Sequence, residues 1–164
     1  MSQHVADVAV RALVVTVSSR AAAGVYEDRG GPILVEGLRE LGFDVDGPQV
    51  VPDGDLVERA LRDAVAASYD IVLTTGGTGL TPRDLTPEIT GRVVDREVPG
   101  IADAIRLRSV DKVPASVLSR GVAGLAGRTL IVNLPGSPGG CRDGMAVLAP
   151  VLRHAVEQVR GGDH

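Results

Sequence analysis

The chain has 164 residues, a formal net charge of −4 and one cysteine, Cys141. This length is typical of a single domain, and one cysteine excludes an internal disulfide and a cysteine-based zinc site within the chain. The acidic balance argues against a general nucleic-acid binder, which needs a clustered basic surface. No apolar run approaches the ~20 residues of a membrane helix, and the N-terminus lacks a secretory pattern. We therefore expect a cytoplasmic protein with neither nucleic acid nor a membrane as its partner.

Strand and helix patterns alternate along the chain. After an expected flexible arm at 1–9, the hydrophobic patterns predict a strand at 12–17, a helix near 31–41, a strand at 44–51, a helix at 56–65 and a strand at 70–74. The second half predicts helices at 87–94 and 101–108, an irregular stretch or short helix at 113–121, a strand at 128–134 and a helix at 140–160 with a bend expected at Pro150. One domain at 10–160 and a flexible tail at 161–164 complete the expectation.

This alternation implies an α/β fold, in which a mostly parallel sheet carries helices on both faces. Ligands of such sheets bind beyond the carboxyl ends of the strands. Polar or glycine-rich loops follow four predicted strands, at 18–20, 52–53, 75–78 and 133–137. If the strands are parallel, these loops meet at one edge of the sheet.

The glycine loop from Gly76 to Gly79 follows a buried strand and precedes a helix. Glycine lets a ligand approach the backbone closely, successive N–H groups can form an anion-binding nest, and a helix N-terminus adds free donors. A phosphate-bearing ligand is therefore our first hypothesis, and a simple tight turn is the alternative. The loop lacks the dinucleotide fingerprint, and the stretch 121–129 has Arg128 where a phosphate-binding P-loop needs lysine.

Two aspartates, Asp53 and Asp84, follow different predicted strands. Each could cap a helix, or the two together could hold Mg²⁺, which prefers carboxylates, water and substrate phosphates. Arg83 and Arg120 lie beside the predicted loops and could bind phosphate through their guanidinium groups. No histidine is placed as a base and no serine nucleophile motif occurs, which favours direct transfer on a metal-bound phosphate.

Several separated motifs resemble one family. They are TTGGTGLTPRDLTPE at 74–88, DREVPG at 95–100, LSRG at 118–121 and NLPGSP at 133–138, together with VTVSSR at 15–20, GVYEDRGGP at 24–32 and PDG at 52–54. In this order they resemble the MogA/MoaB family of molybdenum-cofactor biosynthesis proteins, which is similar to the G domain of gephyrin. The resemblance covers about residues 10–160.

The resemblance implies a three-layer α/β/α sandwich, the molybdopterin-binding fold, commonly assembled as a trimer. It also implies a molybdopterin adenylyltransferase that uses Mg²⁺ and ATP, releases pyrophosphate and supplies a downstream molybdate-insertion protein. Asp84 and Asp53 match the family's catalytic and metal-binding acidic positions. The expected molybdopterin-binding set joins the matched positions to Thr75 and Arg83, and comprises Thr75, Gly76, Gly77, Thr78, Gly79, Arg83, Pro99, Gly100, Ser119 and Arg120. A loop near the nucleotide is matched by Asn133, Pro135, Gly136 and Ser137.

Three alternatives remain open from the sequence. A MoaB-type protein would bind a pterin or cofactor without strong adenylylation, a gephyrin-like module would act as a scaffold, and the loop chemistry alone would suit a generic nucleotide-binding enzyme. The N-terminal loop also departs from the family, because Ser19 stands where many members have an acidic residue and Gly30 or Gly31 where many have Ser or Thr.

Overall fold

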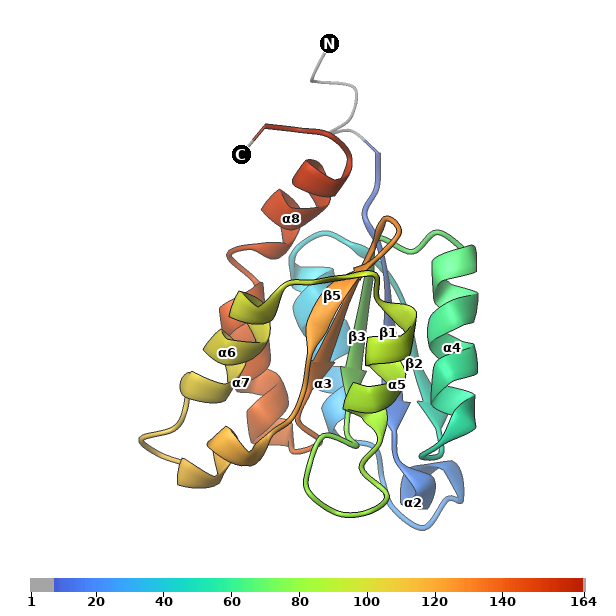
Figure 1. The fold of residues 1–164 in the computed structure, drawn as a ribbon, viewed down its shortest axis with the longest axis vertical. Helices are drawn as coiled ribbons and strands as arrows, with labels where there is room; N and C mark the ends of the chain where they lie inside the picture. Colours follow the sequence, from blue (N-terminus) through green and yellow to red (C-terminus); the bar gives the residue numbers. More distant parts are fainter. Residues whose placement is uncertain (1–7, 164) are drawn as a thin grey trace.

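The computed structural model describes residues 8–163, and its centre is a six-stranded sheet of order β2-β1-β3-β6-β5-β4 (Figure 1). The strands are β1 (Arg11–Val17), β2 (Asp44–Val51), β3 (Ile71–Thr75), β4 (Arg96–Glu97), β5 (Ala123–Ala126) and β6 (Thr129–Leu134). β1, β2, β3 and β6 run parallel, whereas β5 is antiparallel to both β6 and β4. The prediction of a mostly parallel sheet is confirmed.

Helices cover both faces of this sheet (Figure 1). They are α2 (Ser19–Ala22), α3 (Gly30–Glu40), α4 (Asp55–Ala66), α5 (Thr86–Val93), α6 (Pro99–Leu107), the 3₁₀ helix η1 (Pro114–Leu118), α7 (Pro138–Leu148) and α8 (Leu152–Val159). One core cluster joins the sheet to α3, α6 and α7 through residues such as Leu38, Ile105 and Met145. The other joins it to α4 and α5 through Val57, Leu61 and Ile89, which gives the three-layer α/β/α sandwich.

The structure differs from the predicted elements in the second half of the chain. Strand β5 was not predicted, because its sequence Ala-Gly-Leu-Ala has low β propensity. Gly124 is needed there, since a Cβ would lie 2.7 Å from the carbonyl oxygen of Arg96 on the paired strand. The predicted helix at 140–160 is two helices, α7 and α8. Pro150 separates them, because proline has no N–H to donate and disfavours helical backbone at the preceding residue.

The carboxyl ends of β1, β2, β3 and β6 meet at one edge, at the lower end of the molecule in Figure 1. Backbone bonds tie the loops together there, since Ser18 N donates to Val51 O and Gly76 N donates to Leu134 O. The convergence predicted for the strand-end loops is therefore confirmed. α8 lies at the opposite end (Figure 1).

The expected arm at 1–9 falls mostly outside the described residues, as does His164 of the expected tail. The two glycines that follow α8 still donate to it, Gly161 N to Gln158 O and Gly162 N to Glu157 O. Within the described part of the chain, no helix is long and apolar enough to cross a membrane.

Candidate active site

In the glycine loop, the carbonyl groups of three residues accept hydrogen bonds from the protein, whereas their N–H groups find no acceptor in the described part of the chain. Thr86 N donates to the carbonyl oxygen of Gly77 at 3.1 Å, and Arg120 N donates to that of Thr78 at 2.8 Å. Arg120 Nε donates to the carbonyl oxygen of Gly79 at 2.9 Å. No acceptor among the described residues bonds to the N–H groups of Gly77, Thr78 or Gly79. The loop therefore offers a row of free donors, as an anion-binding nest requires.

Two of the loop glycines are required by the backbone. Gly76 has φ +100° and Gly77 has φ +70°, values that L side chains rarely adopt. A Cβ at Gly76 would lie 2.2 Å from the carbonyl oxygen of Val17, and one at Gly77 would lie 2.2 Å from Thr86 Oγ1. The turn therefore packs against the end of β1 and the start of α5, which fixes the direction of its free N–H groups.

The two predicted carboxylates flank this loop. Asp84 Oδ2 accepts from Thr81 N at 3.0 Å and from Thr81 Oγ1 at 2.8 Å, and it would lie 2.9 Å from a Cβ at Gly79. Asp53 Oδ2 accepts from Ser19 Oγ at 2.8 Å, and Asp53 Oδ1 would lie 3.4 Å from a Cβ at Gly77. Ser19, where the sequence departs from the family, therefore holds Asp53 in place.

Arg120 clamps the loop. Besides its bond to Gly79, its Nη2 donates to the carbonyl oxygen of Asp84 at 2.6 Å, and Nη1 pairs with Glu88. The Arg120 guanidinium beside Glu88 lowers the pKa of that carboxyl below its ordinary value. Three of the five N–H donors of the guanidinium are thus used by the protein, so Arg120 positions the loop, and its predicted contact with phosphate stays a prediction.

A cavity of about 650 Å³ opens beside the loop, within the size range of small-molecule sites. Its floor is the glycine loop with Asp84, and its other sides come from the end of α6, from η1 and from the start of α7. The predicted residues that line it are Gly76, Gly77, Thr78, Gly79, Asp84, Ser119, Pro135, Gly136 and Ser137. Segments from three distant parts of the sequence, 76–84, 105–119 and 135–143, therefore build one site.

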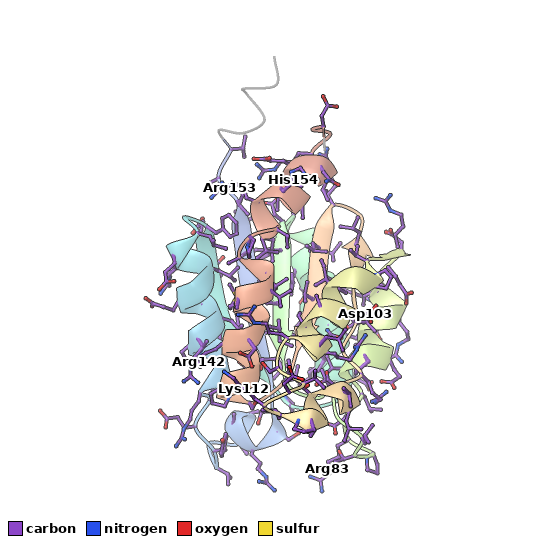
Figure 2. All side chains as sticks on the ribbon, turned by 90° about the vertical axis from the view of Figure 1, so that its left-hand side faces the viewer. Arg83, Asp103, Lys112, Arg142, Arg153 and His154 are labelled. Carbon is purple, nitrogen blue, oxygen red and sulfur yellow. The ribbon has the colours of Figure 1, made fainter. Side chains whose placement is uncertain are left out.

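The remaining predicted residues lie elsewhere. Thr75 is buried under the loop, where its Oγ1 donates to Pro135 O at 2.7 Å. Asn133 is 2 % exposed and bonds to Thr74, Thr90 and Val122, so it ties the sheet to α5 and does not reach the cavity. Arg83 is exposed at the tip of the molecule (Figure 2).

Pro99 and Gly100 are not brought to this cavity either. They are exposed in the first turn of α6, whereas the lining residues Ile105 and Ser109 come from the later part of α6 and the turn that follows it. A helix rises 1.5 Å per residue, so the length of α6 separates the two predicted residues from the site.

Sequence reasoning missed the outer wall of the cavity. The residues not predicted are Leu80, Ile105, Ser109, Val113, Ala115, Ser116, Leu118, Gly139, Gly140 and Asp143. The stretch 113–117 has no periodic pattern or motif, so only the three-dimensional fold places it at the cavity. A second, smaller cavity of about 120 Å³ adjoins the first and shares Gly76 and Gly136 with it.

Comparison with known proteins shows to which family this chain belongs. A family model described as a probable molybdopterin binding domain matches residues 13–154. The chain belongs to this family. The matched range contains the glycine loop, both flanking carboxylates and the lining of the cavity, so the predicted resemblance to MogA and MoaB proteins is confirmed.

Individual members of the family are similar over almost the whole chain. The structure of the molybdopterin biosynthesis Mog protein from Mycobacterium ulcerans superposes with a TM-score of 0.89 at 55% identity, covering 92% of this chain and 99% of that one. The MoaB structure from Thermus thermophilus has a TM-score of 0.86 at 45% identity, covering 93% and 97%. The molybdopterin adenylyltransferase of Helicobacter pylori strain J99 is 37% identical over 154 residues, 90% of this chain and 86% of its own length.

Proposed function

We propose that the protein is a molybdopterin adenylyltransferase of molybdenum-cofactor biosynthesis, which transfers AMP from ATP to the terminal phosphate of molybdopterin. The free N–H groups of Gly77, Thr78 and Gly79, set between Asp53 and Asp84, carry this proposal. An anion-binding nest between two carboxylates suits a reaction that joins two phosphates. Relatives named molybdopterin adenylyltransferase, such as those of H. pylori and Escherichia coli, support it at 37% and 40% identity.

In the proposed reaction a phosphate oxygen of molybdopterin attacks the α-phosphorus of ATP. A new O–P bond forms, the bond from the α-phosphorus to the bridging oxygen breaks, and its electron pair leaves with pyrophosphate. The loop N–H groups hold the attacking phosphate, and Arg120 holds the loop in shape through the carbonyl groups of Gly79 and Asp84. Positioning and electrostatic stabilisation supply the acceleration in such transfers.

The carboxylates fit the Mg²⁺ ion that ATP requires. Oδ1 of Asp53 and Oδ1 of Asp84 receive no hydrogen bond from any described residue, so each carboxylate keeps an oxygen for a ligand. No group of three or more His, Cys, Asp or Glu side chains is placed to hold a metal in the described chain. A two-carboxylate site completed by water and substrate phosphates is the arrangement that Mg²⁺ favours. A bound Mg²⁺ would neutralise the negative charge of the phosphates.

Replacement of Asp84 by Asn tests the proposal. Asn retains an oxygen that can accept from Thr81, so the loop should keep its shape while the negative charge is lost. We expect pyrophosphate release with molybdopterin and Mg-ATP to fall by roughly a hundredfold or more, with molybdopterin still retained. Asp111→Asn is the matched control, since Asp111 is exposed and outside the cavity lining. Full activity of the Asp84 variant would contradict the assigned role.

The second candidate is a pterin-binding protein without strong adenylylation. The similarity to the MoaB structure from Thermus thermophilus, at 45% identity, supports this candidate. The same assay separates the two, because binding of molybdopterin by the unmodified protein without pyrophosphate release would support the second candidate. We further propose a cytoplasmic homotrimer that passes its product to a molybdate-insertion protein.

A further inference from the structure

The cavity contains a carboxylate that the proposed chemistry does not use. Among the lining residues only two have ionisable side chains, Asp84 beside the loop and Asp143 on α7. Asp143 lies five residues along α7 from Pro138, or about 7.5 Å of helix, and its contact with Ser109 places its carboxylate at the part of the cavity beside the end of α6. The apolar residues around that part are Ile105, Val113, Ala115 and Leu118.

Asp143 is half-buried and its charge is not balanced by a neighbouring cation. Ser109, at the end of α6, donates its hydroxyl to Asp143 Oδ2. No lysine or arginine of the described chain forms an ion pair with Asp143. Arg142 beside it in the sequence is exposed (Figure 2). A carboxylate in partly apolar surroundings is stabilised by donors, and one hydroxyl leaves most of its acceptor capacity unused.

We propose that Asp143, held by Ser109, is the specificity residue that binds the 2-amino-4-oxo edge of the pterin ring, an inference that rests on the proposed function. On that edge the N3–H and the 2-amino group point in the same direction as two parallel donors. A carboxylate accepts both at once, as it does from the fork of an arginine. The apolar residues of η1 and α6 contact the ring faces, and the phosphate extends to the glycine loop.

The same carboxylate excludes adenine from this position. The corresponding edge of adenine has one donor, its amino group, beside an acceptor nitrogen, which would face the carboxylate oxygens. A buried polar group left without its partner discriminates strongly against the wrong ligand. Asp143 therefore orients the two substrates, with the pterin in the larger cavity and the adenine outside it.

The first test uses Asp143→Asn, which keeps the size of the side chain and replaces one acceptor by a donor. Anaerobic ultrafiltration measures how much molybdopterin each protein retains. We expect the dissociation constant of molybdopterin to rise by about tenfold or more in the variant, and ATP binding to be unchanged. Asp111→Asn is the control of equal charge change on an exposed turn near α6. Equal retention by the Asp143 variant and the unmodified protein would overturn the inference. Failure of the unmodified protein to retain molybdopterin would instead contradict the proposed function.

The second test needs no variant, so it stands even if Asp143→Asn fails to fold. Neopterin monophosphate and its lumazine counterpart, which has an oxo group in place of the 2-amino group, compete for bound molybdopterin in the unmodified protein. We expect the pterin to displace molybdopterin at concentrations at least about tenfold lower than lumazine. Equal competition by the two, or no competition by the pterin, would overturn the inference. Displacement by AMP as effective as by the pterin would assign the position to adenine nucleotides and also overturn it.

Discussion

At the scale of single residues, Arg120 holds the shape of the glycine loop. The sequence places its guanidinium beside the glycine loop, and in the structure the nearby carbonyl groups accept hydrogen bonds from it. Arg120 donates to those of Gly79 and Asp84 and pairs with Glu88. These bonds fix the carbonyl groups on the side of Arg120, while the N–H groups of residues 77–79 find no acceptor among the described residues.

Replacement of Arg120 by Met tests this role. Charged hydrogen bonds contribute about 1.5–3 kcal/mol each, so we expect pyrophosphate release to fall by tenfold or more. Arg120 lowers the pKa of Glu88 in the folded protein, so their pairing is present above the unfolded pKa and is lost as the pH falls through the folded one. In the variant, a carbon-13 NMR titration should show the Glu88 pKa raised toward its ordinary value.

The control for this variant is Arg62→Met. Arg62 pairs with Glu58 on α4 and lowers its pKa in the same way, but it lies away from the cavity lining. We expect the control to raise the Glu58 pKa and to leave activity unchanged. An Arg120 variant with unchanged activity and a shifted Glu88 pKa would show that the ion pair forms but does not position the loop.

At the scale of elements, the parts of the fold with local signals were predictable. The apolar runs of β1 and β3 and the glycine loop are each visible in a few consecutive residues. The parallel arrangement follows because predicted strands alternate with predicted helices. β5 has no such signal, because alanine and glycine take their structure from what they pack against. Asp143 and Ser109 are 34 residues apart, so their contact depends on how α6 and α7 lie together.

The glycine loop gives a prediction at this scale. Gly76→Ala would force a Cβ against the carbonyl oxygen of Val17 at a φ of +100°, so we expect a loss of unfolding free energy of roughly 1–3 kcal/mol. Gly91→Ala in α5 is the matched control, since nothing lies within 4 Å of a Cβ there. That control should stabilise the protein by roughly 0.5–1 kcal/mol through helix propensity. Urea denaturation measures both, and a Gly76 variant as stable as the unmodified protein would contradict the requirement for glycine.

At the scale of the whole molecule, the two core clusters and the site share one sheet. The inner strands β1, β3 and β6 have side chains in both clusters, such as Val14 and Leu134 on one face and Val15 and Ile131 on the other. The same strands carry the loops of the site at their carboxyl ends. Disturbing either layer of helices therefore disturbs the common sheet, which leads us to expect that the layers unfold together.

Leu61→Ala tests this coupling. Leu61 is fully buried on α4, on the face of the sheet away from α3 and α7, and loss of a buried leucine side chain costs about 2–5 kcal/mol. Leu56→Ala on the same helix is the control, because Leu56 is 48% exposed and its replacement should change the free energy of unfolding by about 0.5 kcal/mol or less.

Two probes follow the two layers during urea denaturation of the Leu61 variant. If the layers unfold together, the transition seen by far-ultraviolet circular dichroism and the transition seen by reaction of Cys141 with a thiol reagent will shift to lower urea concentration by the same amount. Cys141 reports on the opposite layer, where it is buried on α7, and burial raises the pKa of its thiol, so reaction requires opening of that layer. A shift in circular dichroism without a shift in Cys141 exposure would show that the two layers unfold separately.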